Sequence, residues 1–188
     1  MTRGYESFLP LSATHLLLPR IGKRMRGLVR YTWMDINEIL RETGWPKNAI
    51  FSYIGGPIAM SFEDGVTLML GYRPDVDSIV VSMDGVGRPP IKDEPGFFSI
   101  DAEDKVYSKK QFSNLVGCTL KIITVFRSVT RPETAKFPNQ IGMGFSFESG
   151  GVVFGCGFEG DQSGMTLLGY DEIDSSARPL LREIQIAP

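Results

Sequence analysis

Apolar residues recur at helical spacing in two places along the chain, and each stretch begins at a residue suited to cap a helix. Asp35 is expected to cap the first helix, and Gly44 to end it. Ser108 is expected to cap the second, with Gln111 three residues later to complete a capping box and Gly117 as the stop. The two stretches therefore predict two short amphipathic helices.

Strand-like sequence follows each predicted helix. Residues Ala49 to Ile54 and Cys118 to Arg127 are rich in β-branched and aromatic side chains, which favour strands. Further along, Ser78 to Met83 and Met165 to Tyr170 have the same character. Both halves of the chain thus show a helix, a strand and a later strand in the same order.

A Ser-Phe-Glu-x-Gly sequence occurs twice between these strands, at residues 61–65 and 146–150, which are 85 residues apart. A glycine at the end of such a turn suits a type I′ hairpin. Together with the matched helix caps, the repeated turn predicts an internal duplication with copies at residues 34–84 and 107–173. The extra residues of the second copy fall in the proline-bearing stretch from Ser128 to Asn139.

The predicted fold class is α+β with a strand majority, in a single domain that spans residues 1–188. A helix of two turns and a small one-sided sheet are both unstable alone, so the copies are expected to close on each other about a pseudo-two-fold axis. Residues 1–33 are expected along the surface of this domain. Residues Arg182 to Ile186 are expected to add a terminal strand.

Composition supports an ordinary globular chain. Of the 188 residues 42% are hydrophobic, and 21 glycines, 12 prolines and 12 phenylalanines favour short strands with tight turns. No apolar run approaches the length of a membrane span, and the start of the chain lacks the order of a secretory signal. Cys118 and Cys156 lie in apolar runs, where a small buried side chain is the expected role. These features favour a reducing, cytoplasmic location, and they leave the oligomeric state open.

The net charge of −2 is unevenly distributed, because the first 34 residues hold six arginines and lysines and one glutamate. Such a segment suits nucleic acid or anionic lipid, although a solvated face or internal ion pairs are the commoner explanation. Arg24, Arg26 and Arg30 are the candidate nucleic-acid contacts. Tyr31 and Trp33 beside them are interpreted as core residues rather than stacking platforms.

Recognisable catalytic chemistry is missing from the sequence. His15 is the only histidine and is expected to pack in an apolar run, so neither a multi-histidine metal site nor a cofactor is predicted. The glycines between residues 142 and 160 match no phosphate-binding motif, and their alternation with phenylalanine suits sheet packing. The carboxylates of Glu148, Glu159 and Asp161 would serve acid and base roles only in a cleft, and solvated turns are the expected positions. An enzyme that uses these carboxylates remains the third hypothesis.

A non-catalytic binding role is therefore the leading expectation, with a cognate protein as the partner. The candidate contact surface is the densest group of acidic residues, which suits a basic partner, although such residues more commonly serve solubility. This acidic group consists of Glu159, Asp161, Asp171, Glu172 and Asp174.

Two family resemblances accompany this expectation. Leu115-Val116-Gly117, the run from Lys121 to Val125 and the turn from Phe147 to Gly150 resemble small bacterial immunity proteins. That resemblance implies a cytoplasmic protein that binds and blocks a cognate toxin. The doubled helix-and-strand unit also resembles, more distantly, Whirly-type domains. It makes binding of single-stranded nucleic acid the second hypothesis, although no basic strand with interleaved aromatic residues is present.

Overall fold

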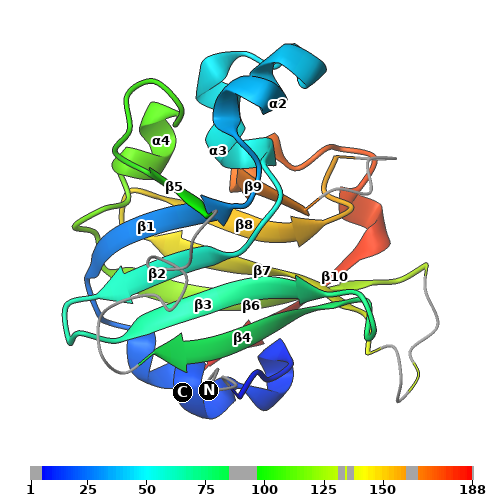
Figure 1. The fold of residues 1–188 in the computed structure, drawn as a ribbon. Helices are drawn as coiled ribbons and strands as arrows, with labels where there is room; N and C mark the ends of the chain where they lie inside the picture. The colour runs from blue at the N-terminus through cyan, green and yellow to red at the C-terminus, as the bar shows by residue number, and fades with distance from the viewer. Residues whose placement is uncertain (1–5, 85–96, 131–133, 135–137, 160–164, 188) are drawn as a thin grey trace.

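A computed structural model describes residues 6–84, 97–130, 134, 138–159 and 165–187, which form two antiparallel five-stranded sheets and short helices (Figure 1). The strands of the first sheet are β1 (Met25–Thr32), β2 (Ile58–Phe62), β3 (Thr67–Arg73), β4 (Ser78–Asp84) and β5 (Phe98–Asp101). Those of the second are β6 (Leu120–Ser128), β7 (Gln140–Phe147), β8 (Gly150–Cys156), β9 (Met165–Gly169) and β10 (Leu181–Ile186). The predicted α+β class with a strand majority is confirmed.

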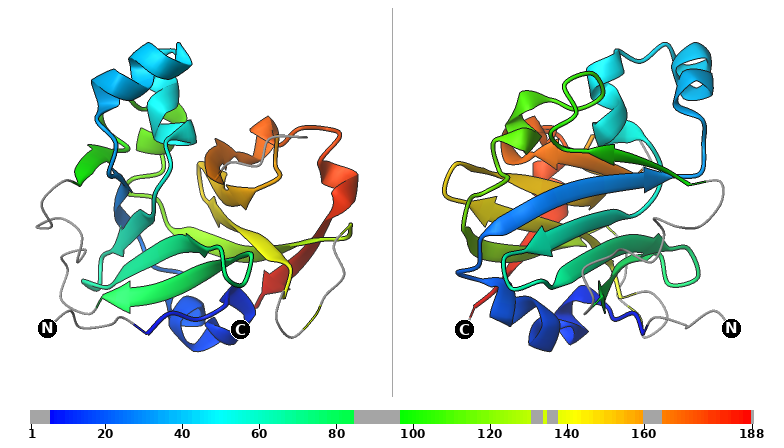
Figure 2. Two further views of the ribbon diagram at one scale, coloured as in Figure 1. Left: turned by 45° about the vertical axis from the view of Figure 1, so that its right-hand side comes forward. Right: turned by 60° about the vertical axis from the view of Figure 1, so that its left-hand side comes forward.

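The helices are short and lie at the ends of the sheets. The α-helices are α1 (Thr14–Leu17), α2 (Ile36–Thr43), α3 (Ile50–Tyr53) and α4 (Lys110–Ser113). The 3-10 turns are η1 (Pro10–Ser12), η2 (Leu18–Arg20), η3 (Lys47–Ala49), η4 (Tyr170–Glu172) and η5 (Arg178–Leu180). The N-terminal turns lie at one end of the molecule, and α2, α3 and α4 lie at the other (Figures 1 and 2).

The two sheets have the same topology. The strand orders are β4-β3-β2-β1-β5 and β10-β6-β7-β8-β9, so each sheet is a four-stranded meander whose fifth strand returns to the far side of the first. Each first strand also carries a register irregularity at its start. Met25 and Gly27 oppose consecutive residues of β2, as Leu120 and Ile122 oppose consecutive residues of β7. The chain therefore contains two similar units.

The units meet in a symmetric exchange of backbone hydrogen bonds just before β1 and β6. Gly22 donates to the Leu120 carbonyl at 2.8 Å, and Gly117 donates to the Met25 carbonyl at 2.8 Å. Met25 donates to the Cys118 carbonyl and Leu120 donates to the Lys23 carbonyl, both at 2.9 Å. A shift of 95 residues converts each bond into its counterpart, so a pseudo-two-fold axis passes between Arg24 and Thr119, which form an isolated bridge.

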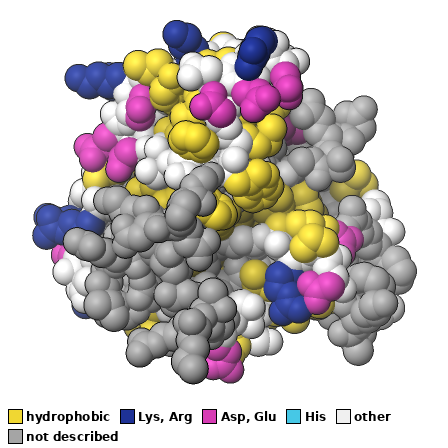
Figure 3. Space-filling model, in the orientation of Figure 1, with side chains coloured by type: hydrophobic (Ala, Val, Ile, Leu, Met, Phe, Trp, Pro, Cys, Tyr) yellow, Lys and Arg dark blue, Asp and Glu magenta, His cyan; other side chains and the backbone are white. Residues whose placement is uncertain are grey.

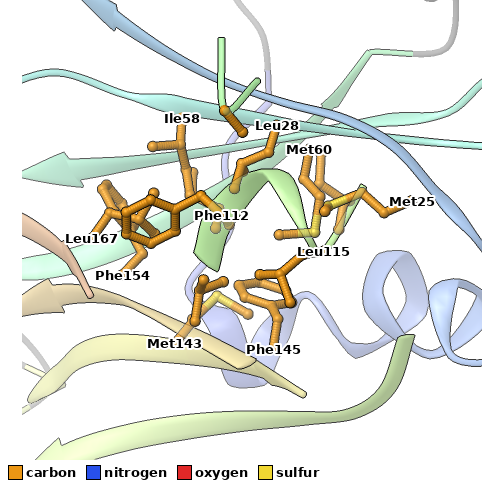
Figure 4. Packing of buried hydrophobic residues seen from close by; sticks show 14 of the residues in the cluster. Met25, Leu28, Ile58, Met60, Phe112, Leu115, Met143, Phe145, Phe154 and Leu167 are labelled. Carbon is orange, nitrogen blue, oxygen red and sulfur yellow. The ribbon is translucent and has the colours of Figure 1, made fainter. Parts of the chain in front are cut away.

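One hydrophobic core joins the inner faces of both sheets. It includes Leu28 and Met60 from the first sheet and Phe145 and Phe154 from the second, and all four are fully buried. Phe112, from α4, projects into this space between the sheets (Figure 4). The burial of Phe112 against apolar side chains of both sheets explains why a helix as short as α4 is stable.

The predicted pairing of the helices is wrong. α2 lies in the connection between β1 and β2, whereas α4 precedes β6. The structural counterpart of α4 is the group of N-terminal turns before β1. The first unit therefore begins before Met34, and residues 25–32 form β1, which lies between β2 and β5 rather than along the surface.

The predicted strand Ala49 to Ile54 is also wrong, because this run forms η3 and α3. Ile50, Phe51 and Ser52 are all buried, and a fully buried short helix shows no alternation that would distinguish it from a strand. The capping role of Ser108 is likewise wrong. α4 begins at Lys110 with no side-chain cap.

The other local predictions are confirmed in part. Asp35 caps α2 by accepting hydrogen bonds from the backbone of Asn37 and Glu38, and Gly44 ends this helix. Both repeated turns connect strands of a hairpin, β2 with β3 and β7 with β8, and Leu181–Ile186 is the predicted terminal strand. The turns are not type I′, since that type requires a positive φ at both central residues and no glutamate, aspartate or serine of these turns has one.

Candidate binding site at the seam between the sheets

The two units differ most in the connection between their first and second strands. Residues 33–57 form this connection in the first unit and carry α2 and α3, whereas residues 129–139 suffice in the second. At the second connection the sheets are closed by the Ser78 hydroxyl, which donates to the Gln140 carbonyl and accepts from the Gln140 backbone, both at 3.2 Å. At the first connection α3 lies between the sheets and adjoins β9. The pseudo-symmetry is therefore broken at this seam.

A pocket of about 410 Å³ opens at the seam. Its walls come from the β1–β2 connection, from the end of β3 and from the first residue of β9. The lining residues are Trp33, Gly55, Gly56, Pro57, Gly71, Tyr72, Pro74 and Met165, and they define the seam pocket. Its surface is largely apolar, as is usual for sites that bind ligands or side chains.

Arg30 fixes the position of the pocket walls from inside the core. Its guanidinium donates to the carbonyls of Phe51 and Ser52 at 3.3 and 3.0 Å, and to the carbonyl of Met165 at 2.9 Å. The group lies 5.7 Å from the centroid of the Phe154 ring. Burial lowers the pKa of Arg30 to about 9, which leaves it charged at neutral pH. A single buried cation thus connects the end of α3 to the start of β9.

Large apolar side chains are exposed at the seam pocket and elsewhere on the β1–β2 connection. Trp33 is 60% exposed, the highest value among the large hydrophobic residues that the structure describes, and its ring meets Phe97 edge to face. Tyr72 and Trp45 are each 37% exposed, so both tryptophans of the chain face solvent. Figure 3 shows hydrophobic side chains exposed across this face below α2. The interpretation of Trp33 as a core residue is wrong.

Charged residues at the rim of the pocket are already engaged. The Tyr72 hydroxyl donates to Asp77, and Arg73 forms an ion pair with Asp75. The hydrogen bond from Arg73 lowers the pKa of the Asp75 carboxyl. The Arg73 guanidinium is therefore neutralised by its neighbour, and the aromatic and proline surfaces remain as the principal contact groups.

The predicted acidic group does not form one free surface. Glu172 accepts from the amide of Gln111 at 2.6 Å and from the Gly169 backbone at 2.8 Å, and it forms an ion pair with Lys109. Partial burial opposes the ionisation of Glu172, but these hydrogen bonds outweigh it and lower the pKa. Glu159 lies beside the Tyr53 hydroxyl, and one of its carboxylate oxygens is buried.

The remaining members of the acidic group lie apart from these contacts. Asp171 is exposed. Asp174 is exposed too, and its carboxylate accepts from the backbone and hydroxyl of Ser176, which lower its pKa. Asp161 lies outside the described residues. The role of the group in partner binding stays a prediction, and three of its members, Glu159, Glu172 and Asp174, already interact with neighbouring groups of this chain.

The predicted basic group is divided as well. Arg24 and Arg26 are exposed on β1 and just before it, whereas Arg30 is fully buried. Burial excludes Arg30 from contact with a phosphate backbone. In a regular strand the side chains of Arg24, Arg26 and Arg30 would all lie on the same face. The register irregularity between Met25 and Gly27 shifts this alternation, so Arg24 and Arg26 lie outside and Arg30 lies inside.

Glu148 has a structural counterpart in the repeat. Its carboxylate accepts from the Thr119 backbone at 3.4 Å, as Glu63 accepts from the Arg24 backbone at 3.2 Å. The hydrogen bond from Lys121 lowers the pKa of Glu148, followed by that from Thr119. The glutamate of the repeated turn therefore braces the start of the neighbouring first strand, beside the pseudo-two-fold axis.

Other sequence candidates have packing roles. Cys156 is buried and Cys118 is partly buried, and no disulfide joins them. His15 is exposed and meets Phe8 edge to face at 5.1 Å, so its expected burial is wrong. Several glycines of β7 and β8 lie against the rings of Phe158 and Tyr170, where any side chain would collide. Sheet packing thus accounts for these glycines, as predicted.

Two searches of the described residues bear on other classes of function. Within these residues, no cluster of three or more histidine, cysteine, aspartate or glutamate side chains is arranged to hold a metal ion. In the same part of the chain, no helix is long and apolar enough to cross a membrane. Comparison with known proteins adds no relative: no family model, curated protein or solved structure matches the chain.

The phenols of Tyr31 and Tyr53 should ionise late. Burial raises the pKa of both to about 12, helped by the charge of Asp101 for Tyr31 and by the hydrogen bond to Glu159 for Tyr53. In the unfolded chain they titrate near 10.0. The unfolded state therefore loses these protons first, and stability should fall as pH rises from 10 to 12.

Absorbance titration at alkaline pH, with urea unfolding at each pH, measures both effects. The variants Tyr31→Phe and Tyr53→Phe should each remove one phenol from the late class and weaken the alkaline loss of stability. An unchanged titration curve in either variant would contradict the assignment for that residue.

Proposed function

We propose that this protein is a non-catalytic binding protein that takes a protein partner at the seam pocket. The observation that carries the proposal is the exposure of Trp33 and Tyr72 at the seam pocket, which lies where the pseudo-symmetry of the two units is broken. Tryptophan and tyrosine are enriched among the residues that dominate binding energy in protein interfaces. Neighbouring exposed apolar side chains often mark interaction sites, so a partner that covers them explains their position.

Inhibition of a bacterial toxin is the form of this function that the resemblance to immunity proteins suggests. The residues that carry this resemblance lie in the second unit, and the seam pocket takes Met165 from that unit. The acidic group would then add electrostatic steering through its exposed members, Asp171 and Asp174. A cytoplasmic location and the absence of catalysis are parts of the same proposal.

Affinity capture from the cells that produce the protein tests the proposal. The wild-type protein should retain one stoichiometric protein partner, and Trp33→Ala with Tyr72→Ala should lose it, because each truncation at such a contact weakens binding by about 2 kcal/mol or more. Leu180→Ala is the matched control, since Leu180 is 44% exposed on η5 and lies outside the pocket lining.

Three results would contradict the proposal. The first is equal retention of the partner by the wild type and the double variant. The second is recovery of oligonucleotide in place of protein, which would favour the nucleic-acid hypothesis. The third is substrate turnover that disappears when Glu148 or Glu159 is replaced in a folded variant.

A further inference from the structure

The connection that carries Trp33 has a small excess of negative charge, because Asp35, Glu38 and Glu42 outnumber Arg41 and Lys47. Asp35 caps α2 two residues after Trp33, and the same helix exposes Glu38 and Glu42, with Arg41 as its only basic residue. Figure 3 shows acidic side chains along the α2 side of the exposed hydrophobic surface. A partner that carries positive charge beside an apolar group would therefore be complementary to this face.

The β3–β4 turn on the other side of the pocket does not offset this charge. Asp75 neutralises Arg73, and the hydroxyl of Tyr72 donates to Asp77. Arg30, which donates to the carbonyl of the lining residue Met165, is fully buried, and its guanidinium nitrogens Nη1 and Nη2 already donate to three carbonyls. A phosphate backbone would meet repulsion at this rim, because its affinity depends on exposed lysine and arginine.

The pocket has the size and lining for one large side chain. Its volume of about 410 Å³ lies at the lower end of the range for ligand sites, which is about 300–1,000 Å³. Pro57 and Pro74 give it rigid walls, and Gly55, where a Cβ would meet no neighbouring atom, leaves the backbone open to approach. An extended peptide can place a single aromatic or aliphatic residue there while its neighbours stay at the charged rim.

We infer that the seam pocket binds a linear segment of the partner protein in which one large apolar side chain is flanked by lysine or arginine. This inference rests on the proposed function and specifies the chemistry of its partner. Trp33 and Tyr72 enclose the apolar side chain, and the carboxylates of α2 interact with the flanking cations.

Short fluorescein-labelled peptides test the inference with the full-length protein. Each peptide has a central phenylalanine, flanked by lysine in one, by serine in the second and by glutamate in the third. Fluorescence anisotropy should rank their affinities in that order, with roughly tenfold between the first and the last at low salt and a smaller ratio at high salt. Trp33→Ala should abolish binding of the lysine-flanked peptide.

The charge contribution is separated by exposed substitutions. Glu38→Gln with Glu42→Gln should reduce the preference for the lysine-flanked peptide several-fold, whereas Glu183→Gln on β10 should leave it unchanged. Thermal unfolding of each variant establishes that the fold is retained.

The outcomes distinguish this inference from the function on which it rests. Equal affinity for all three peptides, abolished by Trp33→Ala, would retain the seam pocket as a protein-binding site and overturn the charge assignment. Stronger binding of the glutamate-flanked peptide, or binding of no peptide, would also overturn the inference. The proposed function itself fails only if capture of the natural partner is insensitive to Trp33 and Tyr72.

Discussion

Replacement of Gly56 by alanine is expected to lower the free energy of unfolding by about 4 kcal/mol, from backbone strain and overpacking together. Gly56 has a φ of +130°, which side chains of L-residues rarely adopt. A Cβ at this position would also collide with the carbonyl oxygen of Tyr31, a backbone atom of β1 that cannot move independently of the sheet. Urea unfolding followed by circular dichroism measures the effect.

Gly27→Ala is the matched control, because Gly27 lies in β1, has no positive φ and would place its Cβ in open space. Its expected change is within about 1 kcal/mol. A loss of similar size in both variants would mean that the close approach of the Gly56 backbone to β1 is not a structural requirement. The walls of the seam pocket would then be less rigid than the structure indicates.

Phe112→Ala is expected to destabilise the protein by about 4 kcal/mol, the usual range for truncation of a buried phenylalanine. Phe112 is fully buried between the two sheets, and its ring centroid lies 5.2 Å from that of Phe51. The truncation removes contacts with both sheets at once, and the rigid strands cannot collapse into the space. The loss should appear in the midpoint of urea unfolding, with little change in its slope.

Val106→Ala gives the comparison for this region, because Val106 is 49% exposed and lies shortly before α4. Its expected effect is less than about 0.5 kcal/mol. A small effect of Phe112→Ala, comparable to that of Val106→Ala, would contradict the role of α4 as a filling element between the sheets.

Several features of the fold were accessible from sequence because they depend on local chemistry. Asp35 and Gly44 define α2 through backbone bonding and backbone conformation within one segment, and the Ser-Phe-Glu-x-Gly turns join adjacent strands. Such signals survive in any tertiary context. The strand majority and the terminal strand β10 follow from the same kind of local pattern.

The pairing of the units was inaccessible because it depends on long-range register. β1 and β6 are equivalent in position but share only an apolar alternation, whereas the capped helices, which look alike in sequence, occupy different connections. Arg30 added to the error. A buried arginine without a carboxylate partner is rare, so its charge indicated a surface segment where the structure has a central strand.

The binding site was missed for a related reason. Its residues come from the β1–β2 connection, the end of β3 and the start of β9, which no sequence spacing brings together. Trp33 was noticed, but a large aromatic residue beside a strand is more commonly buried. Two features of the sequence could have indicated this site. They are the Gly55-Gly56-Pro57 run and the second tryptophan, at residue 45, which lie in the same connection.

The hydrogen bonds exchanged between Gly22 and Leu120 and between Gly117 and Met25 have the geometry of an isologous interface, in which each partner offers the other the same donors and acceptors. If the two units were separate identical chains, they would form a closed two-fold dimer, and any recess would occur twice or not at all. Joined in one polypeptide, each unit can diverge without changing the other. The single chain can therefore keep a symmetric scaffold and present one copy of an asymmetric contact surface.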